Sequence, residues 1–277
     1  MLNAYISKLI SESLLSLYPV FVKKINLPID IQLWTRLITY TMISLFFISY
    51  SFVSKNILTL ECITLALINL AHIYTSYEGF SNLDSGVSFS IFNVYPLLIL
   101  LFSGVLWTPA YLIAIVGLII FVIGHYVDIN SNEKSIINKE FYFGITMIIL
   151  AAITEALMYF LIRNVETDNS WNHVFLSYFL GSIVITWFLF SDSNKNNIKN
   201  LDWYTIGIAI LINGLIGSIG YYLRFYSSYR LDPSTYAMLS FFGIIMAYFY
   251  GYVFNNEKIT IYKVAGTILI ILSNCII

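Results

Sequence analysis

Ten apolar stretches alternate with short polar pieces along the 277 residues of the chain. A helix needs about 20 apolar residues to cross the ~30 Å hydrocarbon core of a bilayer. Each stretch has about that length, so the pattern predicts ten membrane-spanning helices, over residues 4–22, 31–53, 57–79, 86–106, 109–127, 141–163, 171–190, 203–224, 234–254 and 260–277. The longest polar stretches, 128–140 and 191–202, are too short to form a domain of their own.

Helices are favoured over a barrel, because residues 111–127 and 141–153 are apolar on every side. A barrel strand would alternate apolar and polar residues over about ten positions. In lipid, only a helix satisfies its own backbone over a continuous apolar run. The expected fold class is therefore all-α, a polytopic membrane protein with ten transmembrane helices.

Composition agrees with this reading and excludes other classes. The chain is 59% hydrophobic and only 10% charged, whereas a soluble domain carries about 25% charged residues. A net charge of −1 offers no basic field for nucleic acid, and two cysteines in apolar runs argue against a disulfide framework or a cysteine metal site. We expect no cofactor and no metal. The expected partners are the lipid bilayer and a small-molecule substrate, and a homo-oligomer is compatible with the sequence.

Matching positions recur at a nearly constant offset. Asp84 precedes the fourth segment and Asp232 the ninth, each after a leucine, at an offset of 148. Gly117 in the fifth segment and Gly266 in the tenth differ by 149. The chain thus reads as a duplication of a five-segment unit.

The two units are residues 1–130 and 138–277, and their first segments carry Glu12 and Glu155, respectively. An odd number of segments per unit makes the second insert upside down. Inverted repeats are a hallmark of alternating-access transporters, whose substrate site lies near the bilayer midplane.

From the ninth segment onward, the motifs are Leu231-Asp232-Pro233-Ser234-Thr235-Tyr236-Ala237-Met238-Leu239-Ser240, then Gly251, Glu257-Lys258-Ile259-Thr260 and Gly266. In the first unit, Pro96, Gly104 and Gly117 fall at comparable places, and Tyr18-Pro19 to Lys23-Lys24 ends the first segment. This order resembles the drug/metabolite transporter superfamily, in particular its ten-span EamA type.

The resemblance implies two inverted five-helix repeats and transport of amino acids, nucleosides, drugs or other metabolites. It implies structural roles for five residues of the helix ends and packing faces: Pro96, Gly104, Gly117, Gly251 and Gly266. The chain departs from the family pattern at Trp107-Thr108, Phe242-Gly243 and Leu14-Leu15-Ser16. The substrate and the coupling ion therefore stay open.

Polar residues inside the segments are candidates for the substrate site, because an ionisable group in hydrocarbon costs roughly 2.5–3.5 kcal/mol on insertion scales. Three helix faces collect them: Glu12, Ser16, Pro19 and Lys23; Asn69, His72 and Ser76; and Asn213, Gly217, Gly220 and Arg224. The offset of 148 maps the second face onto the third, with Asn69 on Gly217 and Ser76 on Arg224. We expect these faces to line a central cavity, where the glycines leave room for a ligand or for a close helix contact.

The expected substrate-binding residues are Glu12, Tyr18, Asn69, His72, Tyr74, Asn93, Glu155, Tyr159, Asn213, Tyr222 and Arg224. Glu12 and Glu155 would titrate or gate, the latter with proton coupling, because low dielectric favours a protonated carboxyl group. His72 and the asparagines would hydrogen-bond the solute, and Arg224 would pair with an anionic group. Three structural alternatives stay open: Glu12 reaching the headgroups, His72 packing, and Arg224 anchoring to phosphates.

Rival functions have weaker support. Gly86-Val87-Ser88 has the spacing of a nucleophilic serine turn, with His125 in the next segment, but no orienting acid or oxyanion set accompanies it. We therefore expect no enzyme. Sparse polar groups in two mirrored sets suit a gated site better than a channel pore. A flippase for amphiphiles or lipid-linked solutes stays an alternative, since tyrosine-rich walls suit amphipathic molecules.

The distribution of basic residues bears on the orientation of the chain in the membrane. Five lie on the side of the termini, counting Lys8 and Arg224, and nine on the opposite side, counting Arg36. The count favours the opposite side in the cytoplasm, whereas the family resemblance implies cytoplasmic termini. The expected location is the cell (plasma) membrane.

Overall fold

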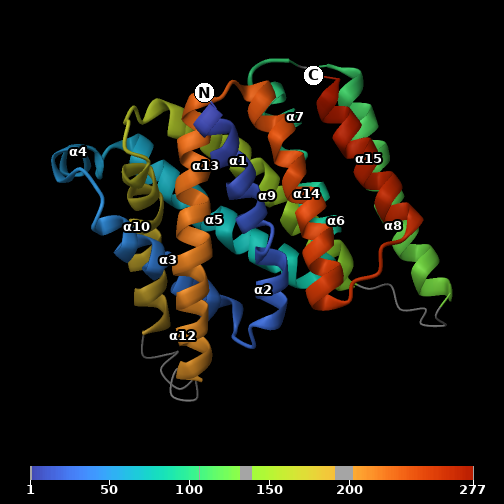
Figure 1. The fold of residues 1–277 in the computed structure, drawn as a ribbon, viewed down its shortest axis with the longest axis horizontal. Coiled ribbons are helices and arrows are strands. Elements are labelled where there is room, and N and C mark those ends of the chain that lie inside the picture. Colours follow the sequence, from blue (N-terminus) through green and yellow to red (C-terminus); the bar gives the residue numbers. More distant parts are fainter. Residues whose placement is uncertain (1, 106, 132–138, 191–201, 277) are drawn as a thin grey trace.

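The computed structural model describes residues 2–105, 107–131, 139–190 and 202–276. These residues form helices and short connections, with no strand among them, and Figure 1 shows their arrangement. The helices are α1 (Leu2–Leu15), α2 (Tyr18–Lys24), α3 (Ile29–Leu45), α4 (Tyr50–Asn56), α5 (Leu60–Asn82), α6 (Ser85–Phe92), α7 (Tyr95–Phe102), α8 (Pro109–Ser131), α9 (Lys139–Asn164), α10 (Ser170–Leu189), α12 (Trp203–Ile212), the π-helix η1 (Asn213–Ser218), α13 (Ile219–Arg230), α14 (Pro233–Asn255) and α15 (Ile261–Cys275). Most of the polar stretches 128–140 and 191–202 lies outside the residues whose placement is described.

Within the described residues, five helical stretches are long and apolar enough to cross a membrane: Ser85–Phe102, Lys139–Asn164, Ser170–Leu189, Trp203–Arg230 and Met238–Asn255. A sixth is counted if α4 and α5, which meet at 91°, form one span. Two shorter apolar helices, Pro109–His125 and Ile261–Cys275, accompany them. The chain is therefore an all-α integral membrane protein, and ten crossings stay a prediction.

Two predicted segments end earlier than expected. The second segment, predicted over 31–53, stops as a helix at Leu45, and Ser49 precedes the separate helix α4. The backbone N–H of Ser49 donates to Asn172 Oδ1 at 2.8 Å, so a side chain of α10 satisfies a backbone donor at the start of α4. The fourth segment, predicted to reach residue 106, ends at Phe102. Gly104 follows with φ of 93°, a left-handed conformation that favours glycine.

Three helical stretches are interrupted in their interior. α1 and α2 are separated just before Pro19, and α6 and α7 just before Pro96. Proline has no N–H to donate and its ring clashes with the preceding turn, which breaks a helix. The break at Pro96 lies at a residue for which the family resemblance implies a structural role. The third interruption is the π-helix η1 between α12 and α13.

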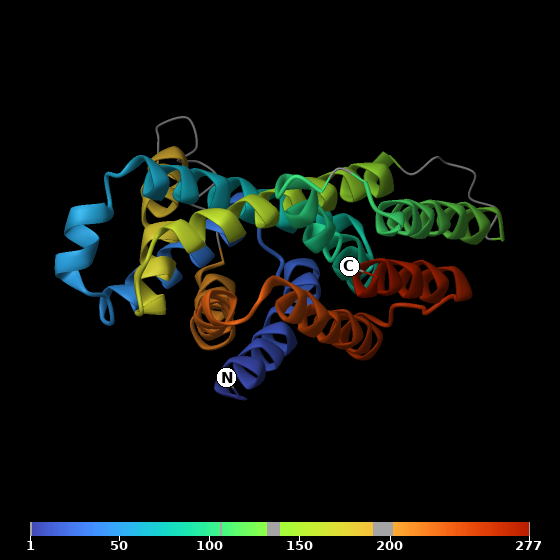
Figure 2. The same cartoon turned by 90° about the horizontal axis from the view of Figure 1, so that it is seen from above.

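Helices from the first and second halves of the sequence pack side by side. α8 packs on α15, α3 on α10 and α6 on α14, and α1 contacts α13 while α5 contacts α9. α8 and α15 lie at one end of the molecule and α4 at the other (Figure 2). A Cβ added to Gly117 would lie 3.0 Å from the Gly266 carbonyl oxygen, so this pair of glycines permits the close approach of α8 and α15. Both termini lie at the same end of the bundle (Figure 1).

Candidate functional site

Four buried charged residues from three helices meet in the interior. We call Lys8, Glu12, Glu155 and Arg224 the charged cluster. Glu12 Oε1 accepts Lys8 Nζ at 2.6 Å and Arg224 Nη2 at 3.2 Å. Arg224 Nη1 bonds Glu155 Oε1 at 3.1 Å. Arg224 of α13 thus joins a carboxylate of α1 to a carboxylate of α9.

The cluster is almost closed to solvent, because its members are between 0% and 7% exposed. A buried ion costs several kcal/mol unless it is paired. Two cations and two anions make the cluster neutral, which reduces this cost. Glu12 is 1% exposed and does not reach the headgroups, and Arg224 bonds to carboxylates inside the protein.

His72 extends the cluster toward α5. Its Nε2 lies 3.6 Å from Glu155 Oε2 and 3.5 Å from the hydroxyl group of Tyr221. Its Nδ1 lies 3.1 Å from the carbonyl oxygen of Ala151. Both ring nitrogens therefore have partners, which orients the imidazole beside the Glu155 carboxyl group.

Arg36 on α3 is a further buried cation, 2% exposed. Five tyrosine rings surround it. We call these rings the tyrosine cage; their centroids lie 4.7–6.0 Å from the guanidinium carbon, and they belong to Tyr18, Tyr40, Tyr77, Tyr178 and Tyr221. Arg36 Nη2 donates to Tyr178 at 3.2 Å, and its Nε has no hydrogen-bond partner in the described part of the chain. Cation–π contacts attract a guanidinium but carry no opposing charge.

Two tyrosines of the cage also bond to one another. Tyr18 and Tyr40, the tyrosine pair, have hydroxyl oxygens 2.6 Å apart, and Tyr18 donates to Asn213 Oδ1 at 2.7 Å. Gly217 of η1 faces them, and a methyl group there would overlap both hydroxyl groups. The space beside Gly217 is therefore filled by side chains of the protein, and the glycine permits a close helix contact.

A small cavity lies between the cage and the cluster. Its volume is about 20 Å³, room for roughly one water molecule. Its walls come from α1 to α3, α5, α6 and α13: Leu15, Tyr18, Arg36, His72, Ser76, Phe80, Phe89, Phe92, Tyr221 and Arg224. Two interrupted stretches border it, near Tyr18 and Phe92. The cavity is closed to any organic solute in this conformation.

Other residues predicted for the site lie elsewhere. Asn69 is buried and donates to the Ser177 carbonyl oxygen at 2.9 Å, and Asn93 donates to the Phe89 carbonyl oxygen at 2.8 Å. The Asn69 amide thus joins α5 to α10, whereas the Asn93 amide bonds to the backbone of its own helix at the end of α6. Tyr74 is 43% exposed on α5.

Two further tyrosines differ in their distance from the charged cluster. Tyr222 stacks on Trp171 at 4.7 Å and is not among the residues that border the described cavities. Tyr159 borders a small void together with Glu155 and Arg224, next to the cluster.

A second polar network closes the end of the bundle opposite the termini. Glu257, between α14 and α15, accepts Lys23 Nζ at 2.6 Å and the backbone N–H of Ser85 at 2.6 Å. The preceding Asn256 has φ of 54°, the left-handed turn that ends α14. A Cβ on Gly251 would overlap the Glu257 carboxylate, so glycine is needed there.

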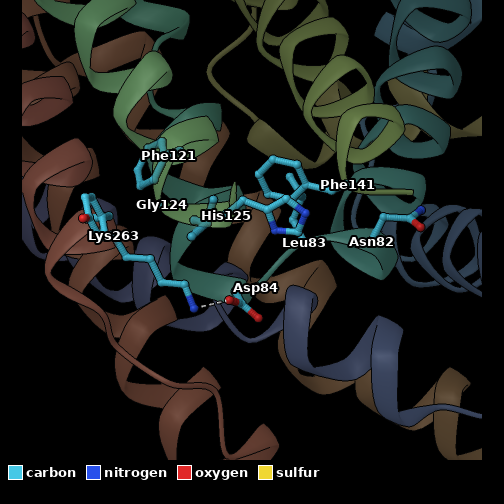
Figure 3. A pocket seen from close by; sticks show the side chains of 10 residues that line it. Asn82, Leu83, Asp84, Phe121, Gly124, His125, Phe141 and Lys263 are labelled. Atoms are coloured by element: carbon cyan, nitrogen blue, oxygen red, sulfur yellow. Dashed lines mark ion pairs between the residues drawn. The ribbon is translucent and has the colours of Figure 1, made fainter. Parts of the chain in front are cut away.

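A larger cavity of about 140 Å³ lies near this network, among the ends of α5, α6, α8, α9 and α15 (Figure 3). Lys263 forms an ion pair with Asp84 beside it, and His125 stacks on Phe141 with 3.6 Å between ring centroids. Ser88, the serine of the nucleophile-like motif, donates to a backbone carbonyl oxygen instead. The charged cluster is absent from these walls, and no group of three potential metal ligands occurs in the described ranges.

The sequence analysis missed Lys8 and Arg36, which it assigned to the membrane surfaces. The structure corrects this: they are 0% and 2% exposed. Each lies within a predicted segment, and that position was the available signal, because a cation there must be paired or bound inside. Without these two and Arg224, three basic residues remain on the side of the termini and eight on the other. The revised count still favours the opposite side in the cytoplasm.

Comparison with known proteins gives three findings. The sequence model of the EamA-like transporter family matches residues 142–277. A solved crystal structure aligns with a TM-score of 0.61 at 13% identity, covering 99% of this chain and 97% of the other. That identity supports a shared fold and nothing further. No curated protein gives a significant match.

Proposed function

Because residues 142–277 belong to the EamA-like transporter family, we propose that the protein is a secondary-active carrier of a small organic metabolite, located in the plasma membrane. The observation that carries the proposal is the charged cluster, a solvent-excluded set of four ionisable side chains in a membrane protein. Intramembrane ionisable residues are costly and commonly mark a transport pathway.

The carrier would consist of two inverted five-helix halves, 1–130 and 138–277, with ten crossings. The helix contacts support this, because exchanging each predicted segment for its counterpart in the other half leaves the pairing unchanged. The α1–α13 contact corresponds to α5–α9, while α3–α10, α6–α14 and α8–α15 correspond to themselves. Asp84 and Asp232 occupy the same place, immediately before α6 and α14.

Alternating access would begin when the ion pairs of the charged cluster break. Glu12 and Glu155 come from the first segments of the two halves and bond to one arginine, Arg224. Protonation of Glu155 would remove one negative charge from this bridge and loosen α9 from α13. His72, 3.6 Å away, is placed to exchange that proton. The interrupted stretches α1–α2 and α6–α7 would bend as the cavity opens.

The test uses protein reconstituted in liposomes with a pH dye inside. Pools of amino acids, nucleosides and carboxylates are added outside under a proton gradient. Wild-type protein should give saturable, solute-dependent proton entry, and Glu155→Gln should lose it while keeping its helical circular dichroism spectrum. Glu166→Gln, an exposed carboxylate after α9, is the matched control and should transport normally.

Two results would contradict the proposal. Proton-coupled uptake by Glu155→Gln at the wild-type rate would remove this carboxyl group from the mechanism. Solute flux that never saturates and shows no competition between solutes would indicate a channel.

A further inference from the structure

The interior contains one more positive charge than the described residues neutralise. Within the charged cluster, each carboxylate is already bound: Glu12 by Lys8 and Arg224, and Glu155 by Arg224. Arg36 forms no ion pair with any described residue. The buried polar core therefore carries an excess charge of about +1, located at Arg36.

The tyrosine cage leaves part of the donor capacity of Arg36 unused. A guanidinium has five N–H donors in a planar fork, and its natural partner is a planar oxyanion. Arg36 Nη2 donates to the Tyr178 hydroxyl group at 3.2 Å, the Tyr77 hydroxyl group is a second hydrogen-bond partner of Arg36, and Nε has no partner among the described residues. The hydroxyl groups of Tyr18 and Tyr40 are occupied with each other. A fully buried donor without an acceptor is rare in a finished core and calls for an explanation.

The geometry around Arg36 fits an organic anion. Arg36 borders the 20 Å³ cavity together with Tyr18 and Tyr221 of the cage, and His72 and Ser76 of α5 border it too. An anionic group at Arg36 would neutralise the excess charge, and the rings of the cage would contact the organic part of the solute. Arg224 borders the cavity too, but its charge is already neutralised.

We propose that the transported solute carries a carboxylate and that Arg36 binds it, with the tyrosine cage holding the adjoining carbon skeleton. This assignment rests on the proposed transport function for its physiological meaning. Its chemical core, a carboxylate site at Arg36, can be tested by binding alone.

The binding test measures the thermal unfolding midpoint of purified protein in detergent. The probes are formate, acetate and benzoate, with benzamide as the neutral analogue of benzoate and sodium chloride matching ionic strength. A bound probe stabilises the form that binds it. We expect at least one carboxylate to raise the midpoint of wild-type protein, with benzoate effective and benzamide without effect. If no carboxylate shifts the wild-type midpoint, or benzamide acts as strongly as benzoate, the proposal is wrong.

Variants locate the effect. Arg36→Gln should abolish the benzoate shift, and Arg36→Lys should weaken it about ten-fold in concentration, because lysine keeps the charge but loses the fork. Arg230→Gln is the matched control: its guanidinium lies 3.9 Å from the Tyr226 ring at the exposed end of α13. It should respond like wild type. Should Arg36→Gln not fold, Arg36→Lys decides, and a wild-type response from Arg36→Lys would overturn the proposal.

The outcomes separate this inference from the transport proposal. A carboxylate shift lost in Arg36→Gln, without solute flux in liposomes, would support the Arg36 site and contradict transport. Saturable transport that Arg36→Gln leaves intact, for carboxylates as for neutral solutes, would support transport and overturn the Arg36 site.

Discussion

Removing the Glu12 charge should destabilise the protein more than any other single charge removal in α1. Among the described residues, Glu12 is the only ion-pair partner of Lys8, and it shares Arg224 with Glu155 of α9. In Glu12→Gln, two buried cations would face one carboxylate. The volume of the side chain hardly changes, so the effect reports charge rather than packing.

The magnitude follows from distance and burial. At an effective dielectric constant of about 20, unit charges separated by the two distances at Glu12 attract by about 5–6 kcal/mol each, before desolvation is counted. Measured net costs of removing one partner from a buried ion pair are about 3–5 kcal/mol. Since Lys8 is 0% and Arg224 4% exposed, neither can turn to water without moving a helix. We therefore expect Glu12→Gln to lose about 3–5 kcal/mol of unfolding free energy.

A double variant tests whether charge balance is the cause. Lys8→Met combined with Glu12→Gln leaves Arg224 paired with Glu155, and the cluster is neutral again. We expect the double variant to regain most of the lost stability, a coupling of at least about 1.5 kcal/mol. The assay is unfolding by a graded replacement of mild detergent with sodium dodecyl sulfate, followed by circular dichroism.

The control is Glu61→Gln, which removes an exposed carboxylate in the first turn of α5 and should change stability by less than about 0.5 kcal/mol. A loss below about 1 kcal/mol in Glu12→Gln would refute the reasoning. A double variant as unstable as Glu12→Gln alone would also refute it, because restoring the neutrality of the cluster would then not restore stability.

Two more predictions concern packing and the closed end of the bundle. Gly217→Ala should lose about 1–3 kcal/mol of unfolding free energy, because the added methyl group overlaps the tyrosine pair. Gly207→Ala, which has open space around it, should be neutral or stabilising in the same unfolding assay. Equal losses of stability in the two variants would contradict this prediction. Glu257→Ala removes the acceptor of the Ser85 backbone N–H. A hydrogen bond to a charged group contributes ~1.5 kcal/mol, so hydrogen–deuterium exchange at the start of α6 should accelerate about ten-fold. Unchanged exchange would contradict a stabilising role for this network.

The positions of the helices could be predicted from the sequence, because in lipid a continuous apolar run has few alternatives. Each of the ten predicted segments is occupied by one or more helices. The early end of α3 could not be predicted, since the Ser49 backbone bonds to Asn172, 123 residues away. The π-helix η1 is likewise a tertiary feature, formed where Gly217 meets the tyrosine pair.

Of the polar face predicted for the second half, Arg224 borders the central cavity, while Gly217 and Gly220 pack against side chains of other helices. The offset of 148 pairs Ser76 with Arg224, and both border the central cavity. It also pairs His72 with Gly220, yet Gly220 packs against Leu15 rather than opening a space. A glycine in a sequence leaves both outcomes open, because only the neighbouring helix decides what fills the gap.

Arg36 and Lys8 show why counting charges by position in a segment fails. Insertion scales assign an arginine a free-energy cost that depends on its depth in lipid, but in a folded helix bundle the arginine can be surrounded by protein. Arg36 is stabilised by tyrosine rings and by a hydrogen bond to the Tyr178 hydroxyl group, whereas Lys8 receives a carboxylate one turn away in the same helix. A pair at i and i+4 is visible in sequence, so Lys8–Glu12 could have been found. A cage formed by residues of α2, α3, α5, α10 and α13 has no such local signature. Only the tertiary structure reveals that Arg36 is a buried cation without an anionic partner among the described residues.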